Sequence, residues 1–215
     1  MKETMTIHKA LTEIKILANR IQDEINSSTF VVANKHSNTK IGGLAIADFT
    51  AETKEKYQSI RTLINRRNAI KQAVTKSNAE VSVSIGGKNY TVAEAIDMKT
   101  VGLKYLKSLI DTLQRQYSAA KELANRSNGE KLEQRSDDYV KSMYSGADMK
   151  NMADEIKKVR EDFITAQTME LIDPIDAAKE ITQLKNQYDA FMAEVDSALS
   201  VSNALTTIEI EYETK

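Results

Sequence analysis

The chain has 215 residues, of which 41% are apolar and 28% charged, and it contains no cysteine. This apolar content argues against disorder, and the lack of cysteine excludes disulfides, thiolate metal sites and thiol nucleophiles. The formal net charge of −1 is unlike the basic excess of general nucleic-acid-binding proteins. No apolar run approaches the roughly 18 residues that span a bilayer, and no apolar leader follows Met1, so we expect a cytoplasmic protein without a membrane partner.

The first part of the chain is predicted to form two long helices joined by a polar loop. Between Ile7 and Asn26, apolar residues recur at three- and four-residue steps, which indicates one buried helical face, and Thr6 is a suitable N-cap. The same period returns from about Thr50 to Asn78. In the loop between the helices, the pattern predicts a short strand at 30–32 and a turn at Gly42-Gly43.

A β-hairpin is predicted next, at about residues 80–92. Apolar and polar residues alternate up to Gly86-Gly87, and this pair supplies a two-residue turn that tolerates positive φ. A turn of that length sets Val83 opposite Tyr90. Because an isolated hairpin is only marginally stable, it must pack on helices or pair with another strand.

The second half of the chain is predicted to be mostly helical. The capping box Thr91–Glu94 opens a helix that extends to about Asn128, and a less regular helix covers Glu130 to Tyr144. A further helix is predicted from Asp148 to about Thr168. In the last one, Asp173 is the cap and Pro174 the first helical residue, and the helix runs to about Leu199.

The C-terminal residues 206–212 change to a period of two, which predicts a strand. This strand is a natural third partner for the glycine hairpin, within one chain or between chains. The expected fold is therefore mainly α, a single domain over 1–215 of long antiparallel, bundle-like helices with a small β-hairpin and a C-terminal strand. Long helices with one-sided stripes often complete their burial by association, so we expect a homo-oligomer.

One polar anomaly stands out on the second helix. Arg67 falls at the centre of its apolar stripe, where a guanidinium is costly unless it is paired. One interpretation is a phosphate or carboxylate clamp, with Lys71 one turn later, Arg66 and Asn68 flanking the stripe, and Asn78 within it. The alternatives are an ion pair with an acidic residue of another helix, or an arginine that extends along the surface to water.

Other residues give no signal for a cofactor, a metal or a catalytic group. His8 and His36 lack a further ligand at a suitable spacing, so a transition-metal site is not expected. The Gly86-Gly87-Lys88 segment lacks the spacing of a phosphate-binding loop. Most tyrosines are predicted to be core or interface anchors, although Tyr90 on the hairpin could stack on a base.

Several strings of the sequence together resemble a known group of proteins. These strings are residues 7–11, 66–71, 77–79, 90–96 and 202–210. The set is similar to uncharacterised bacteriophage and prophage proteins of about this length, from phages of Gram-positive hosts, and more remotely to small helical septicolysin-like proteins. This resemblance implies a phage origin and a non-enzymatic role, and it identifies no ligand.

Two non-enzymatic functions remain open at this point, and an enzyme is the weakest hypothesis. One of them, the alternative to ligand binding, is a structural or assembly role in a phage tail or baseplate. Long helices and an exposed strand at each end suit assembly by strand addition. In the first hypothesis, an oligomer in the host cytosol sequesters a nucleotide-like defence signal between helices or subunits. Its pocket would be lined by Arg66, Arg67, Asn68, Lys71, Asn78 and Tyr90.

Overall fold

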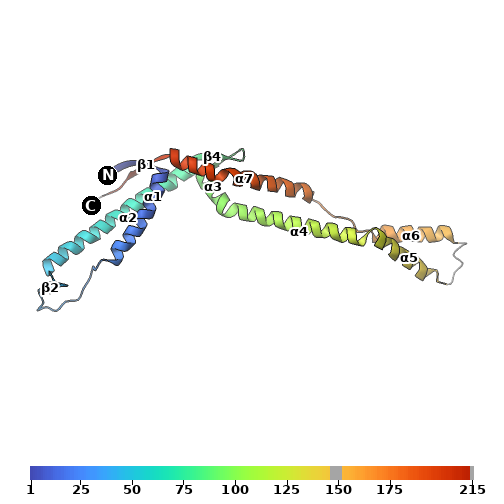
Figure 1. The fold of residues 1–215 in the computed structure, drawn as a ribbon, viewed down its shortest axis with the longest axis horizontal. Coiled ribbons are helices and arrows are strands. Elements are labelled where there is room, and N and C mark those ends of the chain that lie inside the picture. Colours follow the sequence, from blue (N-terminus) through green and yellow to red (C-terminus); the bar gives the residue numbers. More distant parts are fainter. Residues whose placement is uncertain (146–151, 214–215) are drawn as a thin grey trace. The chain divides into compact units, whose positions relative to one another are not determined.

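The computed structural model describes residues 1–145 and 152–213 (Figure 1). The prediction of a mainly α fold with small antiparallel sheets and a C-terminal strand is confirmed. Contacts group the chain into two compact units: unit 1 is Met1–Thr100 with Ala190–Lys215, and unit 2 is Val101–Asp189. The single domain over 1–215 stays a prediction.

The two ends of the chain form one antiparallel ribbon in unit 1. Strand β1 (Lys2–Thr6) pairs with β6 (Thr207–Glu211), with Lys2 opposite Glu211 and Thr4 opposite Glu209. The C-terminal strand is thus confirmed, but its predicted pairing with the glycine hairpin is wrong within the chain; a pairing between chains stays a prediction. The true partner escaped prediction because β1 is a short Thr- and Met-containing strand whose alternation is weak.

Two long helices pack against each other and against this ribbon. Helix α1 (Ile7–Asn26) starts where Thr6 accepts a hydrogen bond from the Lys9 amide, as predicted, and α2 spans Ile46–Glu80. The period-two face of the ribbon and the stripes of both helices close one apolar core. Its buried members are Met5, Ile7, Ala10, Leu17, Ile70, Val74, Ile208 and Ile210.

The loop between α1 and α2 contains a miniature hairpin. Strands β2 (Lys40–Ile41) and β3 (Leu44–Ala45) flank the predicted Gly42-Gly43 turn, in which both glycines have positive φ. The strand predicted at 30–32 is wrong, because this stretch is irregular and Val31 is 88% exposed. Hydrophobic residues without a neighbouring strand have no ladder to join.

The glycine hairpin has the predicted register. Strands β4 (Ser82–Ile85) and β5 (Lys88–Thr91) pair with Val83 opposite Tyr90, and the two turn glycines have positive φ. The predicted capping box is present, since Thr91 accepts from the Glu94 amide and Glu94 accepts from the Thr91 amide. It starts α3 (Val92–Asp97). The long helix predicted from here is interrupted by a π-helical segment, Met98–Gly102, before α4 begins.

Unit 2 consists of helices and the segments between them. They are α4 (Leu103–Ser127), α5 (Glu130–Met143), α6 (Ala153–Gln167) and the first part of α7 (Ala177–Leu205). Ile110 of α4 and Ala177, Ile181 and Leu184 of α7 form one buried cluster in this unit. The first residues of the helix predicted from Asp148 lie outside the described part of the chain.

The start of α7 differs from its prediction. Asp173 does act as a cap, because its carboxylate accepts from the Ala177 amide at 2.9 Å. Asp176, however, has a φ of 54°, and this left-handed residue prevents the helix from running through from Pro174. The helix therefore begins at Ala177. In the described part of the chain, none of the helices is long and apolar enough to cross a membrane.

Candidate functional site

Arg66 of α2 is the centre of a polar cluster in unit 1. Its Nη2 lies 2.8 Å from Glu3 Oε2 on β1, and its Nε lies 2.5 Å from Glu13 Oε1 on α1. The guanidinium also donates to the hydroxyl of Tyr212, just after β6, and lies 5.1 Å from the centre of that ring. With 19% of the Arg66 side chain exposed, these contacts are largely shielded from water. The cluster joins both strands of the ribbon to both helices.

The electrostatics of this cluster are those of a satisfied ion-pair network. The hydrogen bond from Arg66 lowers the pKa of the Glu3 carboxyl below its ordinary value of 4.5, although burial acts in the opposite direction. The hydrogen bond to Glu13 is the main cause that raises the pKa of Arg66, against the effect of desolvation. Two carboxylates and an aromatic ring already surround the guanidinium. Arg66 therefore stabilises the fold and is not available to bind a ligand.

The structure corrects the placement of Arg67. Arg67 is half-buried rather than central in the core, and its Nη1 donates to Asn68 Oδ1 at 3.1 Å. The buried face of α2 is formed by Ile70, Ala73 and Val74, which belong to the same core. The direction of Ala73 shifts the centre of this face away from Arg67, which lies at its margin. The arginine paired with acidic residues is its neighbour Arg66. An apolar stripe read from Ile60 onward did not distinguish these two positions.

The other predicted site residues lie on α2 and on the hairpin strand β5. Asn68 and Lys71 are exposed on α2, and Asn78 is half-buried two turns further on. Tyr90 packs edge-on against Phe191 of α7, with ring centroids 5.5 Å apart, and anchors the hairpin. None of these side chains lines the three cavities described next.

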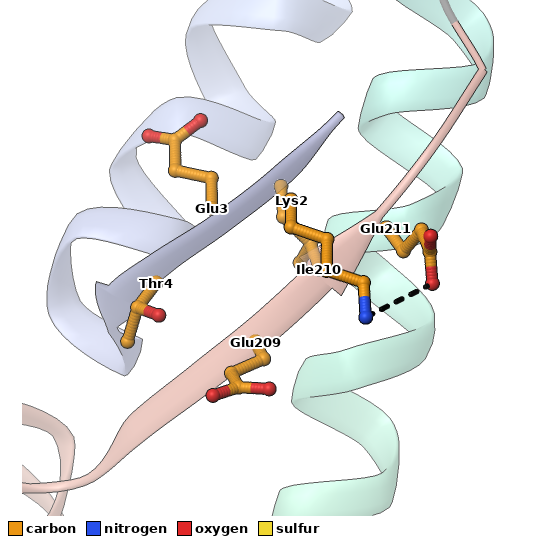
Figure 2. Close-up of a pocket in the computed structure, with 6 residues that line it drawn as sticks. All are labelled: Lys2, Glu3, Thr4, Glu209, Ile210 and Glu211. Carbon is orange, nitrogen blue, oxygen red and sulfur yellow. Dashed lines mark ion pairs between the residues drawn. The ribbon is translucent and has the colours of Figure 1, made fainter.

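The described surface includes the following hollows. One of about 330 Å³ lies on the outer face of the ribbon and is lined by Lys2, Thr4, Glu209 and Glu211, with parts of Glu3 and Ile210 (Figure 2). A second, of about 440 Å³, lies between β4 and residues 197–206. The third, of about 290 Å³, lies in unit 2 between α4 and residues 171–177 and is mainly apolar. The first is richer in carboxylates than in cations, which does not suit an anionic ligand.

The residues that complete the Arg66 cluster were not predicted. Glu13 had a sequence signal, because it falls on the helical line that joins the buried Ala10 and Leu17. Glu3 gave none without knowledge of β1, and Tyr212 was predicted only as part of a strand. Across the residues that the structure describes, no group of His, Asp and Glu side chains is arranged to hold a metal ion.

Comparisons of this chain with protein-family models, with curated proteins and with solved structures found no match.

Proposed function

We propose that this protein is a non-enzymatic assembly protein, a helical subunit that associates with copies of itself, and that it serves as a structural component of a phage tail or baseplate. The observation that carries the proposal is the apolar groove of unit 2. It is lined by Leu113, Tyr117 and Ala120 of α4 and by the segment before α7. In that segment, Ile172 is 82% exposed and Ile175 is 55% exposed.

Exposed isoleucines beside an apolar hollow favour association. Burying one such side chain contributes about 1.5–3 kcal/mol, so two of them in one contact supply a substantial part of a micromolar affinity. A projecting apolar ridge next to a matching groove also suits contact between identical subunits, in which each copy offers both. Contiguous apolar surface of this kind is typical of interaction sites. The resemblance noted above supports the phage role.

The test asks whether the exposed isoleucines beside the groove are needed for self-association. Sedimentation velocity over a wide concentration range is expected to show a wild-type oligomer that the double variant Ile172→Ser/Ile175→Ser dissociates, because serine removes the apolar ridge. The control is Ile16→Ser on α1, which is 60% exposed and lies outside the groove, and which should leave the oligomer intact. A wild-type chain that stays monomeric at every concentration would contradict the proposal.

The phage role is tested separately. A structural component is expected in stoichiometric amounts in purified particles, as measured by quantitative mass spectrometry of the virion. Abundance in the host cytosol together with absence from particles would contradict a tail or baseplate role and would favour the second candidate.

The second candidate is sequestration of an anionic, nucleotide-like ligand in the host cytosol. It is favoured by Arg67 and Lys71, which lie one turn apart on α2 and, within the described residues, form no ion pair with a carboxylate. A phosphate could accept hydrogen bonds from both. Native mass spectrometry of protein purified from infected cells should then show a bound small molecule, which Arg67→Ala loses while the oligomer persists.

A further inference from the structure

Charge is strongly segregated along unit 1. Residues 190–213 contain Glu194, Asp196, Glu209, Glu211 and Glu213 and no basic residue. Residues 56–79 of α2 contain no acidic residue. They hold six cations, namely Lys56, Arg61, Arg66, Arg67, Lys71 and Lys76. Because the net charge of the whole chain is only −1, copies of the protein do not repel one another as a whole.

Part of the α2 cations forms one face, which we call the basic face. Lys56, Arg67 and Lys71 are separated by eleven and four residues, and these spacings return to the same side of a helix. Lys56 lies about 16 Å from Arg67 along the axis, with the buried Ile60 between them on this side. Lys56 and Lys71 are exposed and Arg67 is half-buried. Within the described residues, none of the three is in an ion pair, whereas Arg66 on another side of the helix holds Glu3 and Glu13.

The outer side of the β1–β6 ribbon is the complementary acidic face. Glu209 and Glu211 point to the same side because they are two residues apart on a strand, and Lys2 and Thr4 lie opposite them. Glu3 points to the other side of the ribbon (Figure 2). Lys2 is 3.9 Å from Glu211 in a solvent-exposed pair, which is a weak contact. The hollow of about 330 Å³ on this face has room for long cationic side chains.

The spacing of the charges matches as well as their sign. One turn of four residues separates Arg67 from Lys71 by about 6 Å along the helix axis. Two residues separate Glu209 from Glu211 by about 6.8 Å along the strand. A helix laid along the ribbon can therefore place each cation against one carboxylate.

We propose that the basic face of α2 in one copy docks on the acidic face of the terminal ribbon in a second copy. This inference rests on the proposed self-association and adds the surface that carries it. The two faces belong to different elements, so one contact joins two copies head-to-tail. Each bound pair keeps one basic and one acidic face free at its ends, and the assembly extends until it closes, as a reciprocal dimer or a larger ring, or grows as a filament. The contact sets the orientation of neighbouring copies, and the apolar groove adds affinity.

A charge-swap experiment tests the contact. The variants are Arg67→Glu/Lys71→Glu on the basic face and Glu209→Lys/Glu211→Lys on the acidic face, with Lys157→Glu/Lys158→Glu on the exposed surface of α6 as the matched control. In sedimentation velocity at about 50 mM salt, each of the first two variants alone should self-associate at least tenfold more weakly than wild type, and the control should not. Mixing the two variants should restore association, because every mixed contact again joins opposite charges.

Two additions keep the experiment decisive. Because Arg67 is half-buried, Lys71→Glu alone repeats the test with an exposed residue, and circular dichroism checks the helix content of each variant. If both charge-reversal variants self-associate as strongly as wild type, this inference is wrong and the proposed function stands. If the wild-type protein is monomeric, both are wrong. Binding of a single-stranded RNA oligonucleotide that Arg67→Glu/Lys71→Glu abolishes, with self-association unchanged, would assign the basic face to another partner and overturn the inference.

Discussion

The buried cluster around Ile70 in unit 1 and the one around Ile110 in unit 2 differ in how completely they are covered. In unit 1, the ribbon adds Met5, Ile208 and Ile210 to the residues supplied by α1 and α2, and a paired cation borders this core. In the described part of unit 2, the cluster around Ile110 and Ile181 leaves an open apolar groove at its margin. A short ribbon thus completes one core within the chain, while the other presents surface that a second molecule can cover.

The largest expected effect distinguishes a closed core from an open groove. Ile70→Ala, at a site with 0% exposure, should lower the free energy of unfolding by about 3 kcal/mol, because it removes packed atoms and leaves a cavity. Ile172→Ala in the groove should change it by less than about 0.5 kcal/mol under monomeric conditions, because this side chain is largely solvated. Urea denaturation measures both. Equal losses would mean that unit 2 is as closed as unit 1.

A smaller effect is expected from the polar border of the unit 1 core. Arg66→Met should cost about 2 kcal/mol, because it leaves the carboxylates of Glu3 and Glu13 without their partner in a partly shielded site. The control is Arg67→Met, one residue away, which should cost less than about 0.5 kcal/mol since only an amide of Asn68 loses its donor. A larger loss of unfolding free energy for Arg67→Met than for Arg66→Met would show that Arg67 is the arginine that stabilises the fold.

The capping box at the end of the glycine hairpin gives a still smaller effect. Thr91→Ala removes the acceptor for the Glu94 amide and should reduce stability by about 1 kcal/mol. Thr62→Ala is a matched control, because the Thr62 hydroxyl only donates to a carbonyl of its own helix. Thermal and urea denaturation should rank the two variants in this order, and an unchanged Thr91→Ala protein would show that the hairpin alone positions α3.

The smallest expected effect is a pH dependence. Since Arg66 lowers the pKa of Glu3 in the folded protein, the ionised carboxylate stabilises the fold above its ordinary value of 4.5. This stabilisation is lost as the pH falls from about 4.5 toward the lower pKa of the folded state. Melting temperatures recorded between about pH 6 and pH 3 should therefore fall less steeply for Glu3→Gln than for wild type. Parallel curves would contradict the pairing.

Local patterns were sufficient to predict most of the helices, the glycine hairpin and the C-terminal strand. The helical stripes from Ile7 and along α2, the glycine turn and the capping box at Thr91 all depend on interactions within a few residues, and the structure confirms them. The alternation at 206–212 likewise predicted β6. In each of these cases, the periodicity of the apolar residues or the hydrogen bonds that form the element lie within one short segment of the sequence.

Only the tertiary structure decided which segments meet. Strand β1 is too short, and its alternation too weak, to be predicted as a strand. The pairing of the two chain ends and the Glu3–Arg66 contact therefore could not be predicted from the sequence. Arg66 and Arg67 differ by about 100° around one helix, and the direction of the core that separates them is set by α1 and the ribbon. Periodicity fixes which side chains share a face, but the side that becomes buried depends on partners that are distant in sequence.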